Sequence, residues 1–129
     1  MMKLHVAVFV GLLVVASNAA AEDKVVKRSD AEKKAIDAIK KLDGIDTFDE
    51  KKPGKPVIGV DLSFTKVTDT GLVHLKGMTN LQTLYLSFTK VTDTGLVHLK
   101  GLSKLQSLEL DSTKVTDTGL VHLKGMTNL

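Results

Sequence analysis

Three histidines and three aspartates recur at a fixed spacing and are the first candidates for chemistry in this 129-residue sequence. The histidines stand 24 residues apart, and an aspartate comes five positions before each of them. Imidazoles in a column could hold a transition metal, and Asp and His beside Thr and Ser hydroxyls could suggest a hydrolase triad. The two sets are His74, His98 and His122, and Asp69, Asp93 and Asp117.

The spacing argues against both kinds of site. Each His follows an inward-facing leucine by two residues, roughly 200° around a helix, so it should face solvent. A catalytic triad occurs once, with distinct partners, whereas identical aspartates at three helix starts are expected to cap those helices. In the second repeat Thr92 is the alternative N-cap. We therefore expect no catalytic residue, no metal and no cofactor, and the chain is not predicted to be an enzyme.

The histidines and aspartates belong to a longer repeat with a period of 24 residues. Its invariant part, VTDTGLVHLKG, begins at Val67, Val91 and Val115. One full unit, residues 81–104, reads L-x-x-L-x-L-x-x-T-x-V and then changes to helical spacing. Leu84 and Leu86 alternate as in a strand and should point inward, and Leu96 and Leu99 should share one face of a helix.

Each unit is expected to need its neighbours. One unit cannot bury its own apolar side chains, so the units should stack with their strands side by side. Strands lie about 4.8 Å apart and helices about 8–10 Å apart, so the strands should occupy a concave side and the helices a convex side. The recurring threonine after each strand should bond to nearby backbone at the bend, as Thr65, Thr89 and Thr113.

The outward positions of the strands and of the turns after them differ between units, which predicts that a binding site lies there. The candidate binding residues are Asp61, Phe64, Thr83, Tyr85, Phe88, Glu109 and Asp111. Their carboxylates make the concave face mildly acidic around a central tyrosine. The two phenylalanines should emerge at its rim, close enough to stack. Two alternatives stay open: the rings pack between turns as additional core, or the whole face is solvated strand without a partner.

Residues 22–56 are predicted to form an N-terminal cap and linker before the repeats of residues 57–129. The sequence S-x-x-E at Ser29 is a capping box, in which the Glu32 side chain reaches back to the Ser29 N–H. A helix should follow from about Asp30 to Leu42. Residues 45–50 suggest a short strand, and the Pro- and Gly-containing residues 51–56 suggest a turn or loop.

Residues 1–21 have the pattern of a secretory signal peptide. A lysine is followed by an apolar run, residues 6–16, and then by Ala19 and Ala21 in A-x-A spacing. The run is shorter than the about 20 residues that span a bilayer; an uncleaved anchor is the alternative. We expect cleavage near Ala21, a secreted or periplasmic location, and no membrane association beyond the signal peptide.

Composition excludes several further functions. The absence of cysteine excludes disulfides, thiol nucleophiles and thiolate metal sites. A formal net charge of +3, from 18 basic and 15 acidic side chains, is too small and too mixed to predict nucleic-acid binding. With four Phe, one Tyr and no Trp, the chain also has few rings on which bases could stack.

The repeats resemble a bacterial, secreted class of leucine-rich repeat proteins whose units read close to LxxLxLxxTxVTDxGLxxLxGL. The resemblance covers residues 57–129, with Thr where Asn or Cys is usual, and PGKPVIGVDLS is similar to the family's N-terminal cap. The TDxGL turn also resembles F-box-associated repeats, but no F-box is present. The resemblance implies protein binding or scaffolding without catalysis, and it names no partner.

The predicted fold is thus a short α/β leucine-rich repeat solenoid with an N-terminal helical cap, two full units and a truncated third. The predicted function is non-catalytic binding of a protein or peptide through the concave face, with no nucleic-acid partner. One alternative is a structural or truncated repeat fragment that self-associates through its uncapped C-terminal repeat. Another is a targeting module of an enzyme whose catalytic part is missing from this sequence.

Overall fold

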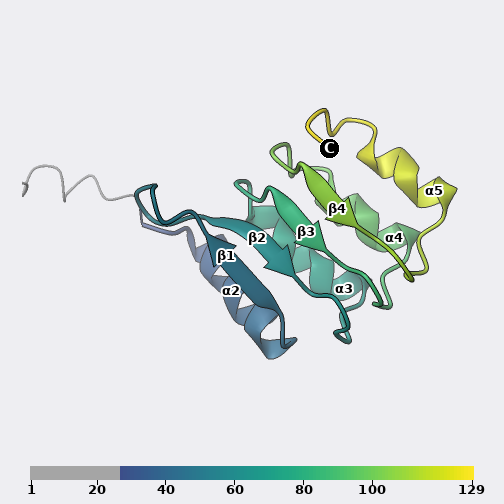
Figure 1. Ribbon diagram of the computed structural model, residues 1–129, viewed down its shortest axis with the longest axis horizontal. Helices are drawn as coiled ribbons and strands as arrows, with labels where there is room; N and C mark the ends of the chain where they lie inside the picture. Colours follow the sequence, from purple (N-terminus) through teal and green to yellow (C-terminus); the bar gives the residue numbers. More distant parts are fainter. Residues whose placement is uncertain (1–26) are drawn as a thin grey trace, which may run out of the picture.

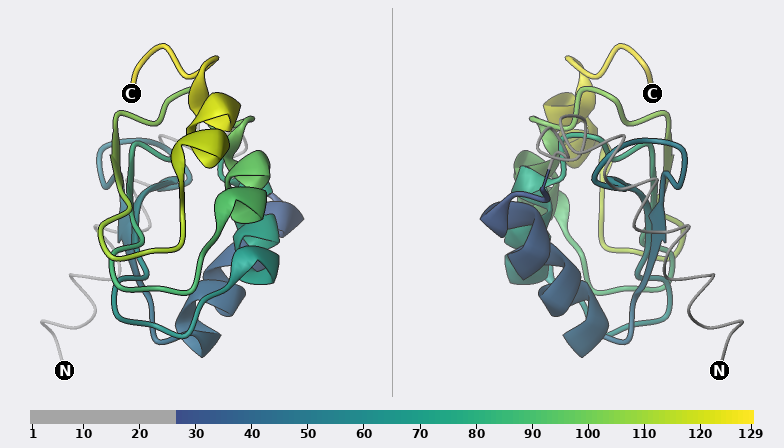
Figure 2. Two further views of the ribbon diagram at one scale, coloured as in Figure 1. Left: turned by 90° about the vertical axis from the view of Figure 1, so that its right-hand side faces the viewer. Right: turned by 90° about the vertical axis from the view of Figure 1, so that its left-hand side faces the viewer.

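The computed structural model describes residues 27–129, so the predicted signal peptide lies outside the described residues. A four-stranded sheet faces a layer of short helices (Figure 1), and the edge-on views of Figure 2 separate the two layers. Within residues 27–129 no helix is both long and apolar enough to cross a membrane. The predicted α/β leucine-rich repeat architecture is confirmed.

The strands follow the chain in the order β1-β2-β3-β4 across the sheet. Their bounds are Ile45–Phe48, Val57–Asp61, Thr83–Tyr85 and Ser107–Glu109. The last three strands come from successive repeats and are parallel, with Asp61, Tyr85 and Glu109 in one row. Strand β1 belongs to the N-terminal cap and pairs antiparallel with β2, which places Ile45 opposite Asp61. We call the outward side of this sheet and of the turns after its strands the concave face.

The helix of each repeat is a single α-turn that continues as a 3₁₀-helix. The α-turns are α3 Asp69–Leu72, α4 Asp93–Leu96 and α5 Asp117–Leu120. The 3₁₀ segments are η1 Val73–Gly77, η2 Val97–Leu99 and η3 Val121–Leu123. With three residues per turn, side chains three apart in a 3₁₀-helix lie directly above one another. Leu96 and Leu99 therefore share one face, and both are fully buried as predicted.

The N-terminal cap is built on helix α2, Asp30–Lys41, which packs against η1. Ser29 caps it by accepting from the Glu32 N–H at 3.1 Å. The second half of the predicted capping box is wrong, because Glu32 Oε1 instead accepts from the Val57 N–H at 2.9 Å. This bond ties α2 to the start of β2 and satisfies a donor that the first repeat would otherwise leave free.

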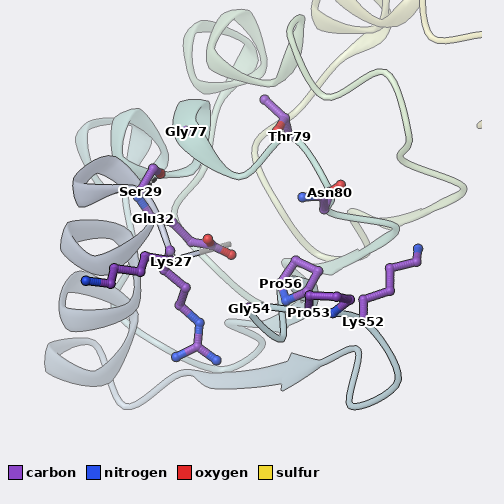
Figure 3. Close-up of a pocket in the computed structure, with 11 residues that line it drawn as sticks. Lys27, Ser29, Glu32, Lys52, Pro53, Gly54, Pro56, Gly77, Thr79 and Asn80 are labelled. Carbon is purple, nitrogen blue, oxygen red and sulfur yellow. Dashed lines mark hydrogen bonds between the residues drawn. The ribbon is translucent and has the colours of Figure 1, made fainter. Parts of the chain in front are cut away.

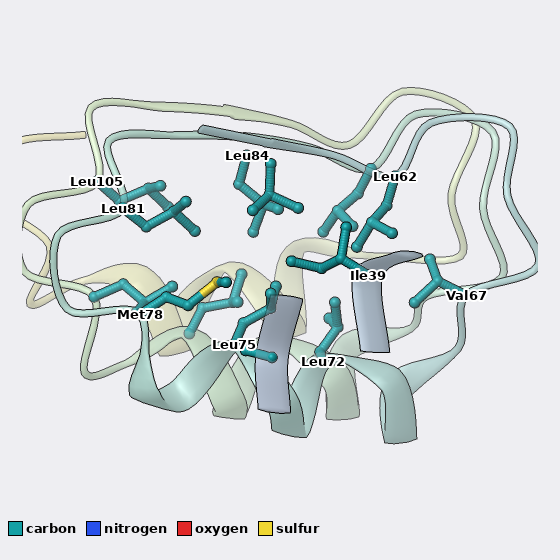
Figure 4. Close-up of a cluster of buried hydrophobic side chains, with 14 of the residues drawn as sticks. Ile39, Leu62, Val67, Leu72, Leu75, Met78, Leu81, Leu84 and Leu105 are labelled. Carbon is teal, nitrogen blue, oxygen red and sulfur yellow. The ribbon is translucent and has the colours of Figure 1, made fainter. Parts of the chain in front are cut away.

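One apolar core lies between the sheet and the helices (Figure 4). Leu81, Leu84 and Leu105 reach into it from the strand side, while Leu72 and Leu75 reach into it from the helix side. Figure 4 also shows Ile39 of α2 entering from the cap. The cap thus covers the first repeat with the same kind of side chain that one repeat offers to the next.

The last repeat is covered on one side only. Leu120 stands at the position of Leu72 and Leu96, yet it is 45% exposed whereas the other two are fully buried. Leu108 and Leu110 of the same repeat are also only partly buried. Together with Val115 and Leu120 they line a shallow hollow of about 350 Å³. We call this surface the C-terminal face.

Candidate binding face

The repeated aspartates link successive repeats. Asp69 Oδ1 accepts from the Thr92 N–H at 2.7 Å, and its Oδ2 accepts from the Thr92 hydroxyl at 2.6 Å. Asp93 holds Thr116 in the same way, at 2.6 Å and 2.6 Å. The N-cap of α4 is Thr92, whose hydroxyl accepts from the Thr94 N–H at 3.3 Å. The alternative N-cap, Thr92, is therefore confirmed for α4. The expectation that Asp69 and Asp93 cap their own helices is wrong, since their carboxylates reach the next unit instead.

These hydrogen bonds also set the charge state of Asp93. The hydroxyl and then the N–H of Thr116 lower the pKa of the Asp93 carboxyl from its ordinary value of 3.8. Donors that point at a carboxylate favour its ionised form. Asp93 is thus an anionic clamp between two units.

A glycine of the following repeat makes room for each of these aspartates. A Cβ at Gly95 would lie 2.5 Å from Asp69 Oδ1 and 3.0 Å from Leu72 Cδ1. Gly119 meets Asp93 in the same manner. Two successive VTDTGL segments thus form one inter-repeat contact: the first supplies the aspartate, and the second supplies the threonine donor and the glycine. An internal copy needs all three residues, because it contacts a neighbour on each side.

The histidines and threonines are parts of the scaffold as well. His74 is exposed as predicted, but His98 and His122 are half-buried, because the 3₁₀ segments of neighbouring repeats pack together. No group of three potential metal ligands occurs among the described residues. The predicted role of the threonines is confirmed by hydroxyl bonds of 2.7 Å to the carbonyls of Leu62, Leu86 and Leu110, from Thr65, Thr89 and Thr113 respectively.

Outside the scaffold, a hollow of about 570 Å³ opens on the concave face. Its lining residues are Asp43, Ile45, Asp61, Ser63, Phe64, Tyr85, Ser87, Phe88, Glu109 and Asp111. Six of the seven predicted binding residues are among them. The seventh, Thr83, lies in the neighbouring row of the sheet beside Gly59 and Ser107, while the hollow follows the row of Tyr85. We call this feature the concave-face hollow.

Two lining residues come from the cap and were not predicted. Asp43 follows α2 with a left-handed backbone (φ 58°), and Ile45 opens β1 with 66% of its surface exposed. The Asp-Gly pair after the helix was a signal for this turn. However, nothing in the sequence gave the direction of β1, and only antiparallel pairing puts Ile45 opposite Asp61.

Phe64 and Phe88 stack at the rim of the hollow. Their ring centroids are 4.6 Å apart and their planes differ by 10°. The rings remain 76% and 54% exposed, so the alternative that they belong to the core is wrong. Both residues have a left-handed backbone, with φ of 60° and 58°, which is unfavourable for a bulky residue. Their N–H groups donate to Ser87 and Asp111 carbonyls at 2.9 and 2.8 Å, which fixes the turns.

The hollow is acidic and contains an unsatisfied hydroxyl. Four carboxylates line it, and in the part of the chain that the structure describes no Lys, Arg or His does. Ser87 also lines the hollow, and it is only 7% exposed. Its Oγ is buried and has no hydrogen-bond partner. A buried hydroxyl in this state is costly unless another molecule satisfies it.

A second hollow of about 390 Å³ lies where α2 meets the 51–56 turn (Figure 3). Two of its charged side chains, Arg28 and Glu32, are already partnered. Arg28 donates to the Lys55 carbonyl at 2.9 and 3.2 Å, and its guanidinium carbon lies 4.4 Å from the centroid of the Phe48 ring. Glu32, labelled in Figure 3, holds the Val57 N–H. These contacts make the second hollow a joint between cap and repeats.

Comparison with known proteins agrees with this architecture. Residues 79–125 match the family model described as Leucine Rich repeats (2 copies). Comparisons with curated proteins and with solved structures found no match. Modules of the matched family typically bind proteins and are typically non-catalytic. The matched stretch spans β3, β4 and the helices behind them, and this part of the chain is similar to leucine-rich repeats.

Proposed function

We propose that this chain is a non-catalytic module that binds a protein or peptide in its concave-face hollow, outside the cytoplasm. The observation that carries the proposal is the exposed, stacked pair of Phe64 and Phe88 at the rim of that hollow. Exposed aromatic side chains of this kind are typical anchors of protein interfaces. The location rests on the signal-peptide pattern of residues 1–21.

Folding does not account for the two phenylalanines. The third repeat has Ser112 at the equivalent position, and its backbone takes the same left-handed conformation (φ 54°). The turn therefore forms without an aromatic side chain. An aromatic residue in this conformation costs about 1–3 kcal/mol, and ring stacking returns only about 0.5–1.5 kcal/mol. Binding a partner supplies a reason to keep them.

Site-specific photocrosslinking tests the proposal. We would replace Phe88 with p-benzoylphenylalanine in the full chain and irradiate it with the extracytoplasmic proteins of its host. The matched control carries the same group at Val97, which is 38% exposed on the helix side. A discrete adduct should form from the Phe88 position alone, and unlabelled wild-type chain should compete it away. Equal adducts from both positions, or none from Phe88, would count against the concave face.

The C-terminal face favours a second candidate function, self-association. It exposes Leu120 at 45% and leaves Leu108, Leu110 and Val115 only partly buried, and exposed ends of repeat stacks are usually covered. Sedimentation of the full chain should then show a concentration-dependent dimer that Leu120→Glu disrupts. A wild-type monomer at the highest concentration tested would dismiss this candidate.

A further inference from the structure

We infer that the concave-face hollow selects a cationic peptide segment, one that presents an Arg or Lys side chain. The inference rests on the proposed binding function and adds the chemistry of the ligand. Four carboxylates, those of Asp43, Asp61, Glu109 and Asp111, converge on one hollow without a basic residue in its lining. The chain as a whole has a formal charge of +3, so the acidity of this face is local. A positively charged ligand is the complement of such a face.

The sheet register places two of these carboxylates on either side of Tyr85. Asp61 and Glu109 occupy the strands next to it in the same row. At one strand spacing each, the two groups lie roughly 10 Å apart with the tyrosine ring between them. A cation laid over Tyr85 is then attracted by both carboxylates and by the ring.

The buried hydroxyl of Ser87 is an independent sign that a ligand enters the hollow. Its Oγ has no partner, and the residue is only 7% exposed. Guanidinium and ammonium groups carry only donors, and one of these donors would satisfy the Ser87 oxygen. A carboxylate ligand could also accept from this hydroxyl, but it would do so beside four negative charges.

The phenylalanine pair favours arginine over lysine. A planar guanidinium stacks on aromatic rings and can pair with a carboxylate through two N–H groups at once. Phe64 and Phe88 offer exposed ring surface next to Asp61 and Asp111 in the same lining. The molecule already contains one such contact, Arg28 over Phe48.

A peptide selection tests the inference. The immobilised full chain would be screened against a display library of short random peptides, and the enriched peptides would be synthesised and titrated. We expect enrichment of Arg and Lys over the input library. Affinity should fall about tenfold or more with Glu109→Gln and Asp111→Asn combined, and should fall between about 50 mM and about 500 mM NaCl as charges are screened. Asp37→Asn, on the exposed side of α2, is the matched control and should change nothing.

The outcomes separate the inference from the proposed function. Peptides that require Phe64 and Phe88 but carry no excess of basic residues would overturn the inference and leave the binding function standing. Failure to enrich any peptide that depends on the hollow would overturn both. If the double variant does not fold, Asp61→Asn and the salt dependence give the same readout, and retained affinity in both would overturn the inference.

Discussion

At the residue scale, the most informative side chain is the aspartate of the VTDTGL segment. Asp93 accepts two hydrogen bonds from Thr116 of the next repeat, and Gly119 leaves the space into which its carboxylate fits. Asp, Thr and Gly thus form one contact that is repeated along the stack. The role of the three residues therefore lies in packing between repeats and not in helix propensity.

The glycine of this contact gives the first prediction. Replacing Gly by Ala inside a helix usually stabilises a protein by about 0.4–1 kcal/mol. Gly95→Ala should instead destabilise by about 1–3 kcal/mol, because its Cβ would lie 2.5 Å from Asp69 Oδ1. Gly101→Ala is the control, since nothing lies within 4 Å of a Cβ there. Urea denaturation measures both, and equal effects would show that the clamp does not constrain Gly95.

The depressed pKa of Asp93 gives the second prediction. Its folded pKa lies below the ordinary value of 3.8 because Thr116 donates to the ionised form. The resulting stabilisation is complete above the unfolded pKa and is lost as pH falls through the folded pKa. In an NMR titration the Asp93 carboxyl should therefore reach its midpoint below 3.8, and Thr116→Val should raise that midpoint. A midpoint that Thr116→Val leaves unchanged would mean that the clamp is absent in solution.

At the element scale, the same short helix should contribute differently to the free energy of unfolding in different repeats. The α-turns of the second and third repeats have the same sequence, DTGL. Leu96 is fully buried between neighbours, and Leu120 is 45% exposed at the C-terminal face. The apolar surface that a helix buries therefore depends on whether a repeat covers it on both sides.

Leucine truncation measures this difference and is the third prediction. Leu96→Ala should lower the free energy of unfolding by about 2–5 kcal/mol, as expected for a buried leucine. Leu120→Ala should cost clearly less, because 45% of the surface of Leu120 is already in water. Similar losses in the two variants, measured by denaturant unfolding, would indicate that the C-terminal face is covered in solution.

Much of this element structure could be predicted from the sequence. Invariant spacing fixed the register, so the buried leucines and the bonds of Thr65 and Thr89 were predicted correctly. The 3₁₀ segments and the inter-repeat role of Asp93 were not predicted, because both depend on how closely neighbouring repeats approach each other. The direction of β1 was not predictable either, since a single short strand carries no mark of its partner.

At the scale of the whole molecule, the invariant residues build the stack and the varied residues build the concave-face hollow. Six of the seven predicted binding residues meet there. Three of them share one row of the sheet, and the other three lie in the turns that follow the strands. Asp43 and Ile45 could not be predicted to join them without the cap's position. The hollow therefore belongs jointly to the cap and the repeats, and its acidity contrasts with the positive net charge of the chain.

The most direct test of this division between scaffold residues and binding residues replaces Phe64 and Phe88, whose backbone conformation is strained. Glycine adopts a left-handed backbone without strain, so Phe64→Gly with Phe88→Gly removes both rings from positions with φ of 60° and 58° without opposing the turn. Binding of a selected peptide and the free energy of unfolding would be measured on the same preparation. We predict that binding falls about tenfold or more, while the free energy of unfolding changes by less than about 1 kcal/mol or rises. Full peptide affinity in this variant, or loss of its fold, would contradict the assignment of Phe64 and Phe88 to binding.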